Sequence, residues 1–303
     1  MTGETMEKTF LLTGPARLEL SNLRGSVDIQ RGDDLQIQVT AVKQAHTGDA
    51  DGTEIEWSQN ANGTVTIATR FRDAWSWLAG AHPCCVEYVV KAPRSCSLRV
   101  KGVSNTLSVE GLEGEFDFYS VSGDVSLRSL TGPVRIHTVS GEVSAVGLAG
   151  ALHLDTVSGD AEFKQANLPS VDASTVSGTV DLQTPLGDGS YRFRSVSGDL
   201  HLRVPPESHC SLELHSLSGK IRTDFPQRSS LEMHGSQAAE VQGGGVPISL
   251  NSVSGNLRLD CDGEVPEDVP ARRPLSAEER RAVLERIERG EVTIAEALTQ
   301  LRG

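Results

Sequence analysis

The chain has 303 residues, of which 37% are hydrophobic and only 4% aromatic, with 30 glycines and a formal net charge of −13. Binding to a phosphate backbone needs Lys and Arg to displace counterions, so this charge argues against a nucleic-acid binder. A core with so few rings must be lined by Val, Leu and Ile, as in stacked β-strands.

No basic stretch followed by an apolar segment opens the sequence, and no window approaches the length of apolar residues that a membrane span needs. We therefore expect neither a secretory signal nor a transmembrane segment. The five cysteines show no metal-type spacing, which predicts a reduced chain with mostly buried thiols in the cytoplasm. They are Cys84, Cys85, Cys96, Cys210 and Cys261.

Residues 1–100 carry a weaker β-pattern. Leu23–Ile29, the stretch from Leu35 and the stretch from Gly63 alternate apolar and polar residues and predict strands. We expect this region to continue the regular repeats that follow or to pack on them. Residues 72–85 break the alternation, and Trp75 and Trp77 there are candidates either to cover an open core or to form an exposed docking site.

Residues 101–261 contain an internal repeat, Ser/Thr followed by Val/Leu and Ser-Gly. It occurs seven times, in steps of 18, 18, 19, 20, 21 and 36 residues, the last equal to two steps of 18. Between Phe225 and Gly245 the pattern blurs, which indicates a distorted coil or an insertion. The repeated glycines are Gly123, Gly141, Gly159, Gly178, Gly198, Gly219 and Gly255.

A nine-residue unit lies inside this repeat. Val121-x-Gly123-x-Val125-x-Leu127 is followed by Leu130-x-Gly132-x-Val134-x-Ile136, and the two kinds of unit then alternate. Each unit predicts a glycine turn and a short strand whose alternate residues point inward. Two units make a coil of about 18 residues, and stacked coils close a continuous aliphatic core. The fold class is mainly β, a single-stranded β-solenoid resembling a parallel β-helix.

Val-Ser-Gly is then a corner of the coil. Glycine is required where the chain turns with positive φ or passes close to the next coil. The serine before it is expected to hydrogen-bond to its equivalent one coil away.

The C-terminal end changes period. Residues 262–274 are rich in proline and predict an extended linker. Residues 275–303 contain two capping boxes and two apolar stripes, which predict a two-helix hairpin too small to fold alone. It is expected to cap its own solenoid, to self-associate or to dock on another protein. The stripes are Val283, Leu284, Ile287, Ile294, Leu298 and Leu301.

Two groups of residues on the repeats are candidates for chemistry. The first follows the repeated glycines: Asp124, Glu142 and Asp160 would stack in a column, either as a solvated edge or, less favourably, around calcium. The second is a possible carbohydrate-active face with Arg135, His137, His153 and Asp155. The two histidines are 16 residues apart, not 18, so they should not stack in register. No hydrolase, zinc-protease, P-loop or dinucleotide motif is present, and no cofactor or metal site is predicted.

The repeated Ser/Thr-Val-Ser-Gly strands, preceded by "VEYVVKAPRSCSLRVKGVSN", resemble a bacterial adhesin-like domain-of-unknown-function family, the YvlB/LiaX-like β-strand repeat proteins. The tail "LSAEERRAVLERIERGEVTIAEALTQLRG" resembles the SHOCT-like helical module of those proteins, although it follows the repeats here. The resemblance implies a β-solenoid without known catalysis and with a link to the cell envelope or its stress response.

The function expected from the sequence is thus a non-enzymatic scaffold, with a protein partner or self-association through the C-terminal helices. The alternatives are a secreted or surface adhesin and, less favoured, a carbohydrate-active enzyme.

Overall fold

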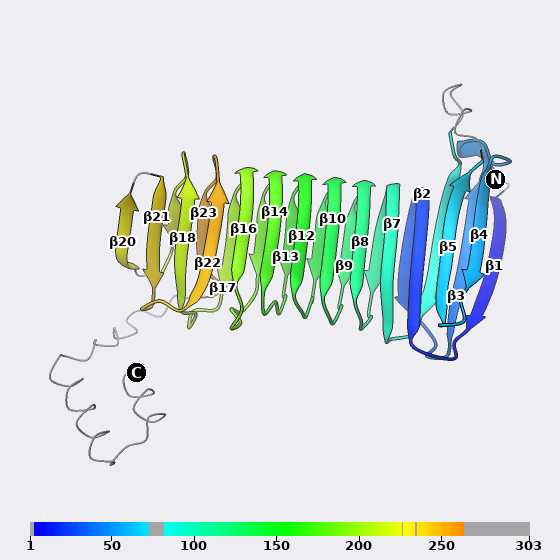
Figure 1. Cartoon of the computed structure of the whole chain (residues 1–303), viewed down its shortest axis with the longest axis horizontal. Coiled ribbons are helices and arrows are strands. Elements are labelled where there is room, and N and C mark those ends of the chain that lie inside the picture. The colour runs from blue at the N-terminus through cyan, green and yellow to red at the C-terminus, as the bar shows by residue number, and fades with distance from the viewer. Residues whose placement is uncertain (1–2, 73–81, 226, 234, 264–303) are drawn as a thin grey trace, which may run out of the picture. The chain divides into compact units, whose positions relative to one another are not determined.

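The computed structural model describes residues 3–72, 82–225, 227–233 and 235–263 (Figure 1). The chain divides into two compact units, residues 1–264 and 265–303. The predicted linker and helical hairpin lie outside the described residues, as do Trp75 and Trp77. The described part is the predicted β-solenoid.

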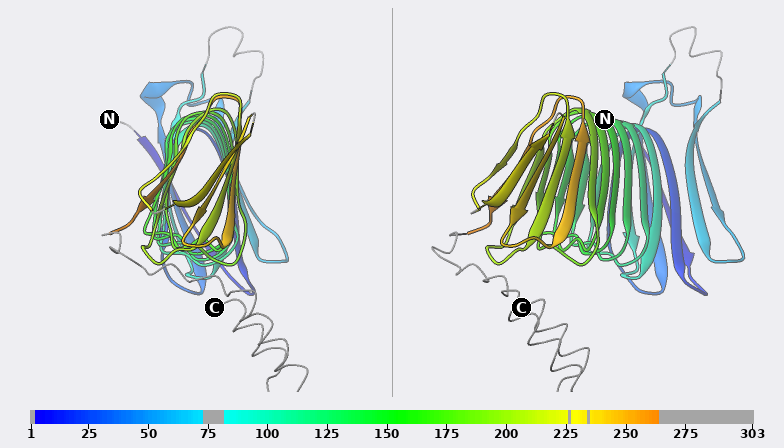
Figure 2. Two further views of the ribbon diagram at one scale, coloured as in Figure 1. Left: turned by 90° about the vertical axis from the view of Figure 1, so that its left-hand side faces the viewer. Right: turned by 60° about the vertical axis from the view of Figure 1, so that its left-hand side comes forward.

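Each regular coil consists of one long and one short strand, and strands of the same kind pair in parallel from coil to coil. In β10, for example, Val134 is in register with Phe116 of β8 and with Leu152 of β12, one coil of 18 residues away on each side. The result is a long-strand face and a short-strand face enclosing one core. Viewed along the axis, the coils superpose as flattened loops (Figure 2).

The long-strand face contains β7 (Cys96–Glu110, first half), β8 (Phe116–Ser122), β10 (Val134–Ser140), β12 (Leu152–Ser158), β14 (Val171–Ser177), β16 (Tyr191–Ser197), β22 (Val246–Ser252) and β18 (Cys210–Ser216). The short-strand face contains the second half of β7, β9 (Val125–Arg128), β11 (Val143–Val146), β13 (Ala161–Lys164), β15 (Val180–Gln183), β17 (Leu200–Val204), β23 (Leu257–Cys261) and β19 (Ile221–Thr223).

The core is aliphatic, as the composition requires. In β10, Val134 and Ile136 point inward with relative exposures of 3% and 0%, and Val143 and Ala145 of β11 face them from the opposite strand. The Leu-x-Gly corner also contributes to the core, because its leucines are buried. They are Leu112, Leu130 and Leu148.

The Val-Ser-Gly corners are held by the close approach of successive backbones. A Cβ on Gly141, where φ is +129°, would lie 2.3 Å from the carbonyl oxygen of Gly123. All seven repeated glycines have such a contact, with the added Cβ 2.0 to 2.3 Å from a backbone oxygen of the neighbouring coil. Positive φ and close approach therefore both exclude side chains at Gly141, and the predicted role of these glycines agrees with their geometry.

The hydrogen bonds at these corners differ from the predicted serine ladder. The hydroxyl of Thr138 donates to the carbonyl of Ser140, and that of Thr175 to the carbonyl of Ser177 at 3.1 Å. In three of the described coils a buried Ser/Thr at the start of the motif, Ser120, Thr138 or Thr175, thus bonds within its own coil, whereas Ser216 donates to the carbonyl of Val253 in the neighbouring coil.

At the N-terminal end the two faces continue through β2 (Ala16–Arg31), which pairs along both halves of β7. The first half of β2 also pairs with β5 (Thr64–Phe71), and the second half with β6 (Cys85–Ala92). Antiparallel strands end both faces: β4 on β5, and β3 on β6 followed by β1. Their bounds are β1 Gly3–Leu11, β3 Gln36–Gln44 and β4 Thr53–Gln59.

At the C-terminal end the order of the coils departs from the order of the sequence. Strand β22 lies between β16 and β18, and β23 lies between β17 and β19. The coil with Gly255 therefore separates the coils with Gly198 and Gly219, and the 36-residue step does not correspond to two coils along the axis. The intervening segment forms the antiparallel strands β20 (Gln227–Met233) and β21 (Ser236–Val241), and β21 pairs with β18.

Three of the five free cysteines, Cys84, Cys96 and Cys210, are buried. Burial raises the pKa of the Cys96 and Cys210 thiols to about 12. These thiols are core residues rather than nucleophiles.

The corner geometry predicts that Gly141→Ala destabilises the protein by about 2 kcal/mol or more, because the new Cβ meets a fixed carbonyl and the residue must keep positive φ. Gly14→Ala is the control, since a Cβ there has no neighbour within 4 Å. Denaturant unfolding of both variants measures the difference, and equal stabilities would contradict the role assigned to the corner.

Candidate functional site

The outer surface of the long-strand face carries the side chains that the core does not use. Residues at alternate positions of each long strand point outward, and the register aligns them in rows along the solenoid. The middle row brings polar and aromatic groups together from eight strands: Lys101, Tyr119, His137, Asp155, Ser174, Arg194, Asn251 and His215.

Beside the middle row, at the corner, lies a column of exposed apolar side chains that we call the valine ridge. Its valines are 46 to 50% exposed and its leucine, at position 217, is 85% exposed. The members are Val103, Val121, Val139, Val157, Val176, Val196, Val253 and Leu217. Equivalent residues of adjacent parallel strands are about 4.8 Å apart, so the ridge is a regular apolar ladder.

As predicted, alternate residues of the short strand after each glycine point inward, but the valine before the glycine, for which the pattern predicts no direction, points outward. Thr138, which is 5% exposed, occupies the last inward position of β10, so Val139 points outward. The inward positions change parity at the corner, from Ile136 and Thr138 to Val143 and Ala145. The sequence shows that the inward positions change from even to odd residue numbers at the corner. It does not show whether the valine lies before or after that change, because the inward residue next to it is a polar threonine.

Two hollows lie on this side of the molecule. One, of about 470 Å³, crosses β8 to β16 between the middle row and the ridge, and includes Tyr119, His137 and Val139 in its lining. The other, of about 770 Å³, is lined by β2, β5 and β7 and includes Ile67, Phe71 and Val103. Both are open and mainly apolar, and Val103 belongs to the ridge.

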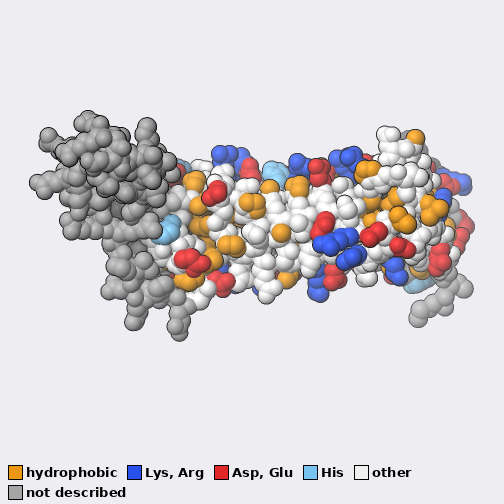
Figure 3. All heavy atoms as spheres, turned by 90° about the horizontal axis from the view of Figure 1, so that it is seen from below, with side chains coloured by type: hydrophobic (Ala, Val, Ile, Leu, Met, Phe, Trp, Pro, Cys, Tyr) orange, Lys and Arg blue, Asp and Glu red, His pale blue; other side chains and the backbone are white. Residues whose placement is uncertain are grey.

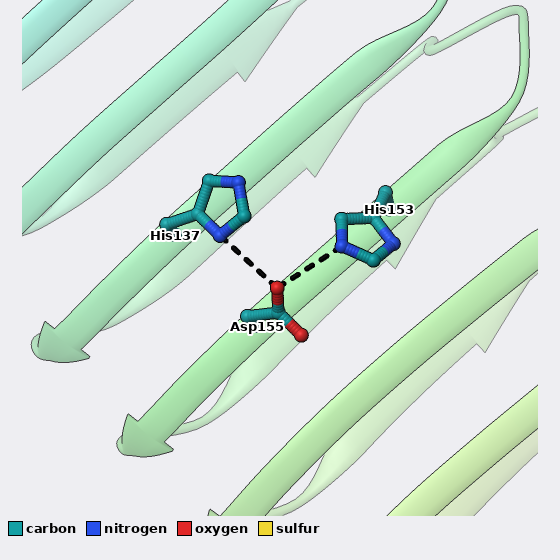
Figure 4. A group of neighbouring side chains, drawn as sticks. All are labelled: His137, His153 and Asp155. Atoms are coloured by element: carbon teal, nitrogen blue, oxygen red, sulfur yellow. Dashed lines mark hydrogen bonds and ion pairs between the residues drawn. The ribbon is translucent and has the colours of Figure 1, made fainter.

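A compact polar cluster interrupts the middle row at β10 and β12 (Figure 4). Nδ1 of His137 and Nε2 of His153 each lie 3.0 Å from Oδ2 of Asp155. His137 is in register with Asp155, whereas His153 is in register with Arg135. The histidines therefore do not stack in one row, as the 16-residue spacing predicted, but they converge diagonally on one carboxylate oxygen.

Aromatic contacts extend the cluster towards β7. The ring of Tyr119 stacks on that of His137 with centroids 4.7 Å apart and an interplanar angle of 13°. Nζ of Lys101 lies 5.7 Å from the centroid of the Tyr119 ring. Partial burial, and then the neighbouring Asp117, raise the pKa of Tyr119, so its hydroxyl stays protonated at neutral pH.

The aspartates that flank this cluster are held in ion pairs. Asp117 accepts from Arg99 at 3.1 Å, and Asp172 accepts from Arg194 at 2.6 Å. Basic and acidic side chains are also interspersed on the face shown in Figure 3, rather than gathered in a field of one sign. Such a surface lacks the basic stripe that marks a nucleic-acid binder.

The carboxylates after the corner glycines act on the backbone. Oδ1 of Asp124 accepts from the amide of Glu142 at 3.0 Å, and Oδ1 of Asp160 from the amide of Thr179 at 2.7 Å. Oδ1 of Asp199 accepts from the amide of Asn256 in the same way, because the coil with Gly255 stacks on the coil with Gly198. These side chains link one coil to the next at an exposed edge, as the prediction of a solvated column requires.

A family model described as Toastrack DUF4097 matches residues 16–260. The chain belongs to the Toastrack DUF4097 family. The adhesin-like domain-of-unknown-function family expected from the sequence is thereby confirmed for the repeats, whereas the stretch of this Toastrack protein that resembles a SHOCT-like module, residues 275–303, lies outside the described residues.

Several solved structures are similar to this Toastrack chain. A candidate adhesin from Bacteroides fragilis has 10% identity and a TM-score of 0.49, covering 84% of this chain and 97% of that one. A candidate adhesin from Parabacteroides distasonis has 13% identity and a TM-score of 0.41, with coverages of 86% and 97%. A candidate cell adhesion protein from Clostridium sporogenes has 9% identity and a TM-score of 0.24, with coverages of 86% and 100%.

No curated protein matches the chain. Within its described part, no helix has the length and apolarity needed to cross a membrane.

The orientation of the ridge predicts different costs for two truncations on the same strand. Ile136→Ala removes a fully buried side chain and should lower the free energy of unfolding by about 2–5 kcal/mol. Val139→Ala removes a half-exposed one and should cost less than about 1 kcal/mol. Denaturant unfolding of the two variants distinguishes this arrangement from one in which both residues face the core.

Proposed function

We propose that this Toastrack protein is a non-enzymatic β-solenoid scaffold that assembles with a second copy of itself along the valine ridge. The proposal rests on one observation, the unbroken column of eight exposed apolar side chains on the long-strand face. Contiguous apolar surface of this kind on a soluble domain marks an interaction site rather than a solvated face.

The ridge offers enough apolar surface for association. Full burial of a valine side chain contributes about 1.5–3 kcal/mol, so completing the burial of a half-exposed one contributes about 1 kcal/mol. Eight such residues supply several kcal/mol against the entropic cost of bringing two chains together. The adjoining apolar hollow, with Tyr119 in its lining, adds to the surface that a partner can cover.

The spacing of the ridge favours a second copy as its partner. Side chains on the ridge recur about every 4.8 Å, the distance between neighbouring strands. An extended peptide places side chains of one face about 6.6 Å apart, and a helix about 6 Å apart, so neither matches every valine. Another ladder with the same pitch does, and a second copy of this chain provides one.

The residues of the long-strand face give less support to the alternative of a carbohydrate-active enzyme. Glycoside hydrolysis uses two carboxylates, one as acid and one as base or nucleophile. Asp117 and Asp172 are occupied by arginines, and Asp155 is shared by two imidazoles.

The proposal also includes a role in assembly for the C-terminal segment and a link to the cell envelope. The apolar stripes predicted for residues 275–303 would give a second contact for self-association or docking. The adhesin-like and envelope-stress association implied by the resemblance fits a protein that displays long, regular surfaces.

Light scattering of the full chain over a range of concentrations tests the proposal. The wild type should form dimers or larger species, and Val139→Thr/Val157→Thr/Val176→Thr should weaken the association by about 100-fold. Threonine keeps the shape and strand propensity of valine but replaces one of its two methyl groups with a hydroxyl. The three changes alter six side chains in a dimer, and a loss of about 0.5 kcal/mol at each corresponds to that factor.

The matched control is Val89→Thr/Val146→Thr, which changes two exposed valines outside the ridge. Its mass should equal that of the wild type. A wild type that stays monomeric at every concentration, or a triple variant that associates as before, would refute assembly along the ridge.

A further inference from the structure

We propose that His137, His153 and Asp155 form a binding site for a divalent transition-metal ion, with Zn²⁺ as the representative. Their candidate ligand atoms, one from each side chain, all lie within 4.8 Å of one another. Both imidazole nitrogens face the same carboxylate oxygen, Oδ2 of Asp155 (Figure 4). His137 and Asp155 line the hollow between the middle row and the valine ridge, but the metal site is formed within one chain and does not depend on self-association.

The two nitrogen-to-oxygen distances are close to what the metal requires. Zinc binds nitrogen and carboxylate oxygen at about 2.0–2.2 Å in a tetrahedron, which places the ligand atoms about 3.4 Å apart. The two nitrogen-to-oxygen distances here are 3.0 Å. An ion can enter when the oxygen retreats by a few tenths of an ångström, and all three side chains are 31 to 42% exposed, so this movement meets little resistance.

The donor set selects the class of metal. Two imidazoles and one carboxylate suit zinc and its first-row neighbours, whereas Ca²⁺ and Mg²⁺ prefer ligands made of oxygen alone. Three protein ligands leave coordination positions that face solvent, as in open zinc sites.

The fold holds these ligands in place. Asp155 is opposite His137 in the β10–β12 register, and His153 lies two residues before Asp155 on the same side of β12. Stacking on Tyr119 fixes the plane of the His137 ring. Two strands and one aromatic contact thus determine the site before any metal arrives, which lowers the entropic cost of binding it.

A second histidine–aspartate pair provides an internal comparison. Nδ1 of His201 lies 3.6 Å from Oδ2 of Asp181, but the guanidinium of Arg203 occupies that same oxygen at 2.8 Å. A cation there would meet a fixed positive charge and a single imidazole. In the described coils the strand ladder places histidine opposite aspartate three times, at His137–Asp155, His153–Asp172 and His201–Asp181. An arginine holds Asp172 and Asp181, whereas Asp155 meets a second imidazole instead.

Calorimetric titration of the untagged, chelator-treated full chain with Zn²⁺ tests the site. We expect one site per chain whose affinity falls by more than about 10-fold in each of His137→Gln, His153→Gln and Asp155→Asn. His201→Gln is the matched control and should bind as the wild type does. Circular dichroism and thermal melting verify that each variant is folded, as expected for side chains outside the core.

Titration with Co²⁺ excludes the cysteines as the ligands. The wild-type complex should show the absorption of a nitrogen–oxygen site without a thiolate charge-transfer band, since Cys85 and Cys261 are the partly exposed thiols. Absence of zinc binding by the wild type, a thiolate band, or binding that survives His137→Gln and His153→Gln would overturn the proposal. So would an equal loss in His201→Gln.

Discussion

The structure depends on how closely the backbone of one coil passes the next at the Val-Ser-Gly corner. A Cβ at any of the seven repeated glycines would lie 2.0 to 2.3 Å from a carbonyl oxygen of the adjacent coil. This contact sets the pitch at the corner to that of the β-ladder, so the strands on both faces can pair without a change of register. Beside several of these glycines a buried threonine bonds within its own coil and an exposed carboxylate bonds to the next coil, as Thr175 and Asp160 do. The core, the rows of outward side chains and the valine ridge all follow from coils stacked in this way.

Stacking of this kind leaves unpaired strands at both ends, and the chain closes them by different means. At the N-terminal end, antiparallel strands β1, β3 and β4 are added to the two faces. At the C-terminal end, the last coil in the sequence, β22 with β23, lies between two earlier coils. The outer of these two coils contains β18, and β21 pairs antiparallel with that strand. A departure from parallel pairing makes the edge a poor template for continued addition of coils, which is how β-proteins limit edge-to-edge aggregation.

The repeat in the sequence predicts the solenoid because its two signals are local: glycine at a crowded turn, and aliphatic residues at alternate positions of a strand. It does not predict the order of the coils at the C-terminal end. The Gly219 and Gly255 motifs both form the corner, and no residue near either motif indicates which coil it stacks on. The outward direction of Val139 was not predicted for a related reason. The inward threonine before it is polar, so hydrophobic alternation does not reveal where the parity changes. His137, His153 and Asp155 were recognised as an exposed group, but their convergence on one oxygen depends on the diagonal between two strands and not on the 18-residue period.

In a repeat protein the periodic positions maintain the stack, and chemistry is found where the period is interrupted. The ridge is periodic, and the assembly proposed for it uses that property: a uniform ladder can pack against any surface of equal pitch, with no residue more important than another. The middle row is different. Its occupants change from lysine to tyrosine, histidine, aspartate, serine and arginine along six strands, while the backbone beneath them stays the same. The regular scaffold thus places an irregular series of side chains at fixed intervals. Only across β10 and β12 does that series, together with His153 from the adjacent row, assemble three metal-ligating atoms at one point in the described coils. A site formed this way needs no loop or cleft, because two neighbouring strands already supply the rigidity that a binding site requires.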